Sequence, residues 1–149
     1  MAVTVDVDIA VDSRELPGIS DFEQWINLAL KNHKGESEIS LRIVDKDEIQ
    51  ALNKHYRDKD KPTNVLAFPA EFPEGVDVPL LGDLVICAPI VIEEARAQQK
   101  AIHSHWAHMV IHGSLHLLGY DHIDEGEAEA MEMLETQLLA TLGYPCPYQ

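Results

Sequence analysis

The sequence has few cysteines, few basic residues and no long apolar run. Its two cysteines, Cys87 and Cys146, lie far apart and form no CxxC pair. This excludes a disulfide framework and is typical of a protein in the reducing cytoplasm. No run of about 18 apolar residues occurs, and the first residues lack the basic and apolar regions of a signal peptide. We therefore expect a cytoplasmic protein with no membrane partner.

Positive charge is also scarce. Lys and Arg together number 11 against 26 Asp and Glu, the formal net charge is −15, and no basic residue follows Lys100. A strongly acidic chain stays soluble and resists non-specific binding to polyanions. Taken alone, this balance argues against a nucleic-acid partner, because backbone phosphates are normally bound by Lys and Arg. Only a local cluster of basic residues would reverse that expectation.

The size and composition are those of a globular domain. The chain has 149 residues, of which 46% are hydrophobic and 25% charged. A chain of this length buries roughly two-thirds of its unfolded surface, so it needs neither disulfides nor a metal in order to fold. We expect a single domain over residues 1–149, in which a metal site would serve chemistry first.

Apolar periodicity predicts alternating strands and helices. Strands are expected at 2–11, 38–44, 63–69 and 81–88, the last of them apolar enough to be central, and helices at 20–31, 46–56, 89–100, 101–118 and 125–142. Ser20 and Glu23 form a capping-box pattern for the first helix, and Gly119 ends the fourth. The acidic tract 124–135 is expected on the exposed face of the last helix. The order predicts an α+β fold, with a single mixed β-sheet of about four strands packed with about five helices.

Histidines are concentrated in one region. Six of the eight lie between positions 103 and 122. His112 and His116 are four residues apart on a predicted helix, so both rings project from one face and can reach one ion at about 2.0–2.1 Å. The helix stop at Gly119 allows the chain to fold back and bring His122 to the same point. We therefore predict a metal site formed by His112, His116 and His122.

Three neutral imidazoles suit Zn²⁺ or a similar divalent ion and leave a fourth position open, as in catalytic sites. The motif differs from the HExxH of zinc proteases because Gly113 follows the first histidine where the protease has its general base. The base would then be metal-bound hydroxide or a carboxylate elsewhere in the chain, such as Asp83, Asp121 or Asp124.

The remaining histidines of the cluster have other expected roles. His108 lies one turn before His112 and could replace one ligand or support the site from behind. His103 and His105 are expected to be solvated or to face a partner.

A basic segment interrupts the acidic sequence. Residues 53–61 contain four of the eleven positive charges, namely Lys54, Arg57, Lys59 and Lys61. Two explanations fit the lysines equally well: a solvated helix end, where the helix dipole favours lysine, and substrate binding. Arg57 differs, because a guanidinium across a cleft from the metal can hold a phosphate with two hydrogen bonds.

Several segments resemble one known family. HGSLHLLGYDH at 112–122 is similar to the signature H-G-x-L-H-L-x-G-Y-D-H of the YbeY family, bacterial rRNA maturation factors and metal-dependent endoribonucleases. The resemblance extends to LNKHYRDKDKPTNVLAFP, to LGDLVIC and to the closing helix EAEAMEMLETQLLATLG. Asn64 and Ala67 depart from the family pattern, which usually has Asp and Ser there.

The resemblance implies an α+β fold and one Zn²⁺ per chain on His112, His116 and His122. It implies hydrolysis of single-stranded RNA, with work in maturation of the small-subunit rRNA 3′ end and in ribosome quality control. Arg57 matches the functional arginine of the family. Lys59 and Lys61, beside it in the basic segment, are our own candidates for substrate binding. The implied partners are rRNA and small-subunit ribosomal proteins or assembly factors.

Other functions fit parts of the pattern. The H-x3-H-x5-H spacing also occurs in zinc peptidases, although Gly113 argues against peptidase chemistry. A non-enzymatic ribosome-assembly factor with a structural zinc is a second alternative, weakened by a chain length that suffices for a core without metal. A small-molecule metallohydrolase is a third.

Overall fold

The computed structural model describes residues 3–12, 16–33, 35–72, 75, 79–120 and 124–148. These residues form four strands and five helices, as expected. The elements in chain order are β1 (Val3–Ile9), α1 (Ile19–Ala29), β2 (Ser37–Val44), α2 (Lys46–Arg57), β3 (Val65–Pro69), β4 (Leu80–Cys87), α3 (Ala88–Ala97), α4 (Ile102–Leu117) and α5 (Glu125–Thr141).

The strands form one mixed sheet in the order β1-β2-β4-β3. β1 pairs parallel with β2 and β2 parallel with β4, whereas β3 pairs antiparallel with β4. The expected α+β class and mixed sheet are thus confirmed. β4 is an interior strand, and Leu84 and Ile86 within it are fully buried, as its apolar sequence predicts.

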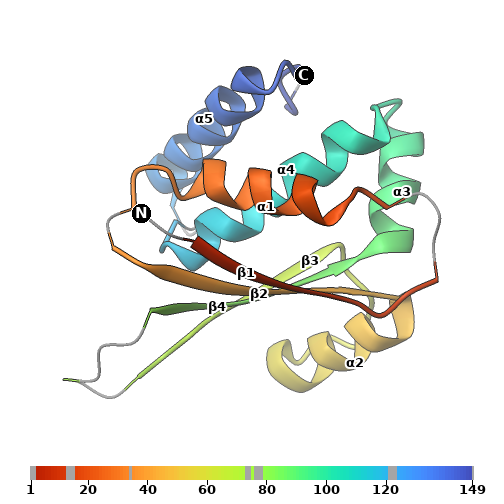
Figure 1. The fold of residues 1–149 in the computed structure, drawn as a ribbon. Helices are drawn as coiled ribbons and strands as arrows, with labels where there is room; N and C mark the ends of the chain where they lie inside the picture. The colour runs from red at the N-terminus through yellow and green to blue at the C-terminus, as the bar shows by residue number, and fades with distance from the viewer. Residues whose placement is uncertain are drawn as a thin grey trace.

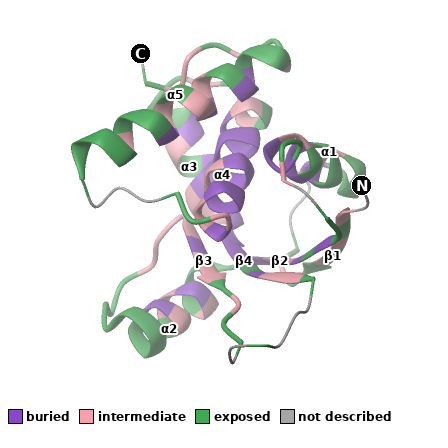
Figure 2. Ribbon diagram, turned by 90° about the vertical axis from the view of Figure 1, so that its left-hand side faces the viewer, coloured by how far each residue is buried: buried purple, intermediate pink, exposed green. Residues whose placement is uncertain are grey.

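Helices cover both faces of the sheet. α1, α3, α4 and α5 lie on one side and α2 on the other (Figure 1). Alternate residues of β4 serve the two faces, since Leu84 and Ile86 join the large core under α1 and α4 while Val85 and Cys87 join a smaller core beside α2. α4 is the most enclosed helix, with other elements on nearly every side (Figure 2).

A glycine allows α4 to approach the sheet closely. A Cβ atom at Gly113 would lie 2.7 Å from Leu84 Cδ2 and 3.2 Å from Val65 Cγ2. Gly113, the residue after His112, therefore lies where α4 packs against the sheet. Gly119 has a φ of 104°, and α4 ends just before it, as expected.

The predicted cap of the first helix was wrong. α1 begins at Ile19, and the backbone amide of Gly18 donates to Asp21 Oδ2 at 2.9 Å. The N-cap is therefore Gly18, two residues before the expected Ser20, and Asp21 takes the position three residues on that was expected of Glu23. α2 has a side-chain cap, because the Asp45 side chain accepts from the Glu48 amide at 2.9 Å.

Among the described residues, no helix combines the length and apolar character needed to cross a membrane.

Candidate metal centre

Two histidines of α4 point at one spot. The Nε2 atoms of His112 and His116 are 3.2 Å apart, as the one-turn spacing predicts. Two nitrogens bound at about 2.05 Å to one tetrahedral ion would be separated by about 3.3 Å. The pair is therefore already spaced as two ligands of a single Zn²⁺-sized ion.

The third predicted ligand, His122, lies outside the described residues, as does Asp121. The helix stop that would bring the chain back towards the pair is present at Gly119. The role of His122 therefore stays a prediction.

Glu135 of α5 corrects the expectation that the acidic tract is exposed throughout. Its side chain is fully buried, and Oε1 lies 2.6 Å from His112 Nδ1 and 3.3 Å from His108 Nε2. The other oxygen, Oε2, accepts a hydrogen bond of 2.6 Å from the Tyr148 hydroxyl. Packing explains the difference: Glu135 shares the inward face of α5 with Met131 and Leu138, four residues before it and three after.

These contacts keep Glu135 ionised. Burial raises the pKa of a carboxyl group, but the hydrogen bonds from His108 and His112 outweigh burial here and lower the pKa of Glu135 to about 2. An ionised carboxylate only accepts hydrogen bonds, so Nδ1 of His112 carries the proton. In the neutral ring, Nε2 then presents its lone pair, and this is the nitrogen that faces His116.

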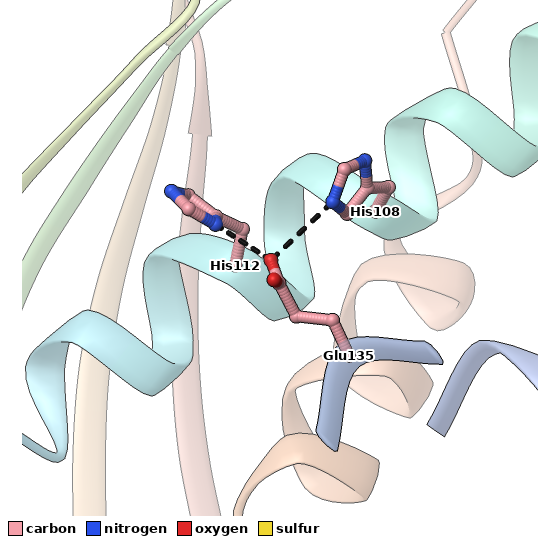
Figure 3. A group of neighbouring side chains, drawn as sticks. All are labelled: His108, His112 and Glu135. Atoms are coloured by element: carbon pink, nitrogen blue, oxygen red, sulfur yellow. Dashed lines mark hydrogen bonds and ion pairs between the residues drawn. The ribbon is translucent and has the colours of Figure 1, made fainter. Parts of the chain in front are cut away.

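His108, His112 and Glu135 are also spaced as a possible metal-binding group (Figure 3). Their ligand atoms all lie within 4.8 Å of one another. His108 is buried, and its Nε2 lies 3.3 Å from Glu135 Oε1. Its expected role as a replacement ligand or a support of the site stays a prediction. His112 thus belongs to both candidate groups.

The expectation for His105 was wrong, because this residue is buried at 3% exposure. Its Nε2 lies 3.0 Å from Glu94 Oε1 on α3. Burial lowers the pKa of His105 below its ordinary 6.5, although Glu94 acts in the opposite direction; His108 and Lys100 lower it further. His103 is half exposed, as expected, and lies 3.4 Å from Asp21.

Asn64, which departs from the family pattern, also contacts Glu94. Its Nδ2 is 3.2 Å and 3.3 Å from the two carboxylate oxygens, and its Oδ1 accepts from the Val65 amide at 2.7 Å. Glu94 therefore contacts both Asn64 and the buried His105.

A cavity of about 460 Å³ opens in front of the histidine pair. Its lining includes Arg57, Asn64, Ala67, His112, Gly113, His116 and Tyr120. Arg57 donates to the Ala67 carbonyl at 2.7 Å, and its guanidinium lies 5.5 Å from the centre of the Phe68 ring. The described residues that line this cavity do not include Lys59 or Lys61, both of which are exposed.

Sequence reasoning missed Glu135 and Tyr148. The spacing of Met131, Glu135 and Leu138 was a usable signal for Glu135, since it places the carboxylate among apolar residues of one helix face. No local pattern marks Tyr148, because its contact depends on how the segment after α5 folds back.

Comparison with known proteins identifies the family. Residues 8–143 match the family described as Endoribonuclease YbeY. The chain is 57% identical over 145 residues to the Endoribonuclease YbeY of Cellvibrio japonicus (strain Ueda107), covering 97% of this chain and 82% of that protein. The solution structure of TM1509 from Thermotoga maritima superposes with a TM-score of 0.62 at 25% identity, covering 95% of this chain and 92% of that one. The chain therefore belongs to the YbeY family of endoribonucleases.

Proposed function

We propose that this endoribonuclease is zinc-dependent and specific for single-stranded RNA, and that it acts in the cytoplasm on small-subunit rRNA, in 3′-end maturation and in ribosome quality control. One observation carries the proposal: the Nε2 atoms of His112 and His116 converge to 3.2 Å in a cavity that Arg57 also lines. A pair of histidines spaced to bind one metal ion, with a guanidinium lining the same open cavity, is an arrangement suited to a phosphodiester. The shared core of sheet and helices supports one catalytic domain over residues 1–149.

His112 and His116 would hold the zinc together with His122. Bound Zn²⁺ supplies Lewis acidity at a phosphoryl oxygen and lowers the pKa of water. Glu135 accepts the Nδ1 proton of His112, so this ring offers Nε2 to the ion. Such a carboxylate–histidine contact fixes the orientation of a ligand ring.

The alternative ligand group of His108, His112 and Glu135 is less well suited to an ion. Two ligand atoms of one Zn²⁺ lie about 3 Å or more apart, given bond lengths of about 2.0–2.2 Å. The 2.6 Å between His112 Nδ1 and Glu135 Oε1 is the length of a charge-assisted hydrogen bond instead. This distance favours a supporting role for Glu135 over direct ligation.

Arg57 would bind the scissile phosphate and stabilise the charge that develops at phosphorus. Its contacts with the Ala67 carbonyl and the Phe68 ring hold the guanidinium at the cavity wall. Lys59 and Lys61 lie outside the cavity, so we infer that they contact the RNA backbone beyond the cleaved bond. The net charge of −15 weakens general RNA binding, and productive encounters would then need small-subunit ribosomal proteins or assembly factors.

The test compares two histidines of the same helix. His116→Ala removes a proposed ligand, whereas His103→Ala removes a half-exposed ring remote from the cavity and serves as the matched control. Zinc content is measured by mass spectrometry, and cleavage is measured on a single-stranded RNA, on the same sequence as a duplex, and on casein.

We expect the parent protein and His103→Ala to hold one zinc and to cleave only the single strand. His116→Ala should lose both zinc and cleavage. Normal cleavage by a zinc-free His116→Ala protein would refute the proposal, and casein hydrolysis would favour a peptidase.

A further inference from the structure

The segment after α5, residues 143–148, folds back against Glu135 and His108, which lie beside the proposed ligand His112. Several contacts anchor it. Lys100 Nζ donates to the Pro147 carbonyl at 2.8 Å, and the Tyr144 amide donates to the Leu139 carbonyl at 3.0 Å. Cys146 Sγ lies 3.7 Å from Thr136 Oγ1. All but the first residue of this segment follow the stretch that matches the family, which ends at residue 143.

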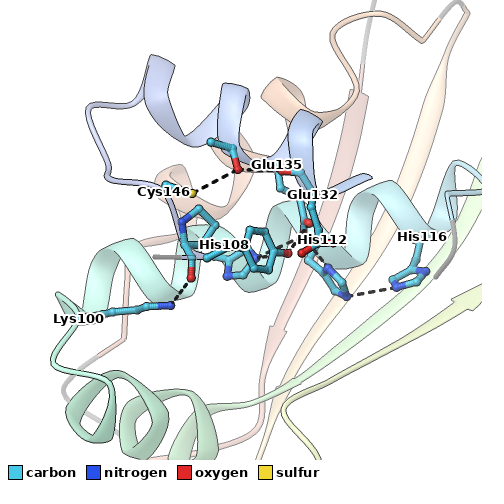
Figure 4. A network of polar contacts seen from close by, with 10 residues as sticks. Lys100, His108, His112, His116, Glu132, Glu135 and Cys146 are labelled. Carbon is cyan, nitrogen blue, oxygen red and sulfur yellow. Dashed lines mark hydrogen bonds and ion pairs between the residues drawn. The ribbon is translucent and has the colours of Figure 1, made fainter. Parts of the chain in front are cut away.

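Tyr148 is the residue through which the segment reaches the site. Its hydroxyl donates to Glu135 Oε2 at 2.6 Å, and its ring packs edge-on against His108 with ring centres 5.5 Å apart. Figure 4 shows the rest of the path, in which Glu135 lies between His108 and His112 and His112 points on to His116.

The carboxylate of Glu135 only accepts hydrogen bonds, which fixes the direction of those that it receives. Glu135 is fully buried, so each carboxylate oxygen needs a donor within the protein. In the part of the chain that the structure describes, Tyr148 donates to Oε2, while His112 and His108 face Oε1. Without the hydroxyl, the carboxylate could rotate towards a better-solvated position. Its hydrogen bond with His112 Nδ1 would then weaken.

We propose that Tyr148 is a positioning residue for the metal centre. Its hydroxyl fixes the orientation of the Glu135 carboxylate, and this carboxylate holds the His112 ring with Nε2 towards the ion. This inference rests on the proposed zinc site at His112. It makes the segment after α5 a determinant of metal affinity, although none of its described residues, 143–148, is among those that line the cavity with His112 and His116.

The experiment uses Tyr148→Phe, which removes one oxygen and keeps the ring. Tyr144→Phe is the matched control, because it makes the same change within the same segment away from Glu135. The affinity for Zn²⁺ is measured by competition with a chromogenic chelator. The ring tautomer of His112 is measured by ¹⁵N NMR on the metal-free proteins, and thermal unfolding of the same samples shows whether each variant is folded.

We expect Tyr148→Phe to weaken zinc binding about fivefold, less than the 10–100-fold typical of direct hydrogen-bond partners of a ligand. Glu135→Ala should show that larger loss, and Glu135→Gln should recover part of it, because its amide oxygen still accepts from Nδ1. Tyr148→Phe should also mix the two tautomers of His112, a change that a merely structural role would not produce. Tyr144→Phe should match the parent protein.

Zinc binding by Tyr148→Phe as tight as in the parent, with an unchanged tautomer, would overturn this inference and leave the proposed zinc site intact. A parent protein that binds no zinc would overturn both. If Tyr148→Phe is unfolded without metal, Lys100→Met tests the same segment by removing the anchor at Pro147, and unchanged zinc affinity in that variant would likewise refute the inference.

Discussion

The close approach of α4 to the sheet at Gly113 gives a prediction whose size follows from the structure. Gly113→Ala would place a Cβ atom 2.7 Å from Leu84 Cδ2 and 3.2 Å from Val65 Cγ2. Leu84 is fully buried, so its methyl group has little room to move. Overpacking of this kind costs about 1–3 kcal/mol. Alanine in place of glycine within a helix stabilises by about 1 kcal/mol, which offsets part of that cost.

Gly126 provides a control that isolates the packing cost. It is exposed in the first turn of α5, and a Cβ atom there would be 3.4 Å from its nearest neighbour, Asp124 Oδ1. Gly126→Ala should therefore gain helix propensity without a clash. The difference in unfolding free energy between the two variants then approximates the packing cost, about 1–3 kcal/mol.

For a chain of about 150 residues, this difference corresponds to a melting temperature about 3–9 °C lower for Gly113→Ala than for Gly126→Ala. The assay is thermal unfolding followed by circular dichroism, with a chelator present so that metal binding does not contribute. Equal melting temperatures for the two variants would refute the argument that glycine is needed for the contact between α4 and the sheet.

Three further predictions concern the cleft and its surroundings. Arg57→Ala should lower RNA cleavage about 100-fold while the zinc content stays unchanged, because it removes charge stabilisation and no ligand; loss of zinc in this variant would contradict the assignment. Because burial lowers the pKa of His105, the folded state binds fewer protons than the unfolded state, so stability should fall as the pH drops below about 6.5. In His105→Gln, the free energy of urea unfolding should change less between pH 7.5 and 5.5 than in the parent. An equal change in the two proteins would count against a lowered pKa of His105. Asn64→Asp should destabilise the protein by about 1 kcal/mol at pH 7, because it replaces a donor to Glu94 with a second carboxylate; urea unfolding that shows no loss would mean that the Asn64 contact contributes nothing.

Local sequence patterns predicted most of the fold. Period-two alternation identified the strands, and apolar stripes with capping residues identified the helices, since both signals are contained within one element. The His112–His116 pair and the stop at Gly119 were predictable for the same reason. The order β1-β2-β4-β3 was not, because strand pairing depends on contacts between distant segments.

The buried residues behind the candidate metal ligands were harder to predict. The many charges between residues 124 and 135 suggested a solvated face, although Glu135 lies on the same side of α5 as Met131 and Leu138. The burial of His105 depends on Glu94 of another helix, and that of Glu135 on Tyr148 beyond the end of α5. Contacts between elements decided both positions, and periodicity within one helix does not specify them.

The proposed metal centre consists of one ion bound by His112, His116 and His122 in front of Arg57. Its decisive test is a crystal structure of the zinc-loaded protein, with anomalous diffraction recorded on both sides of the zinc edge. We predict one anomalous peak per chain, about 2.0–2.1 Å from a ring nitrogen of each of the three histidines. A peak bound instead by His108 and Glu135, or a peak without His122 among its ligands, would rule out the proposed three-histidine site.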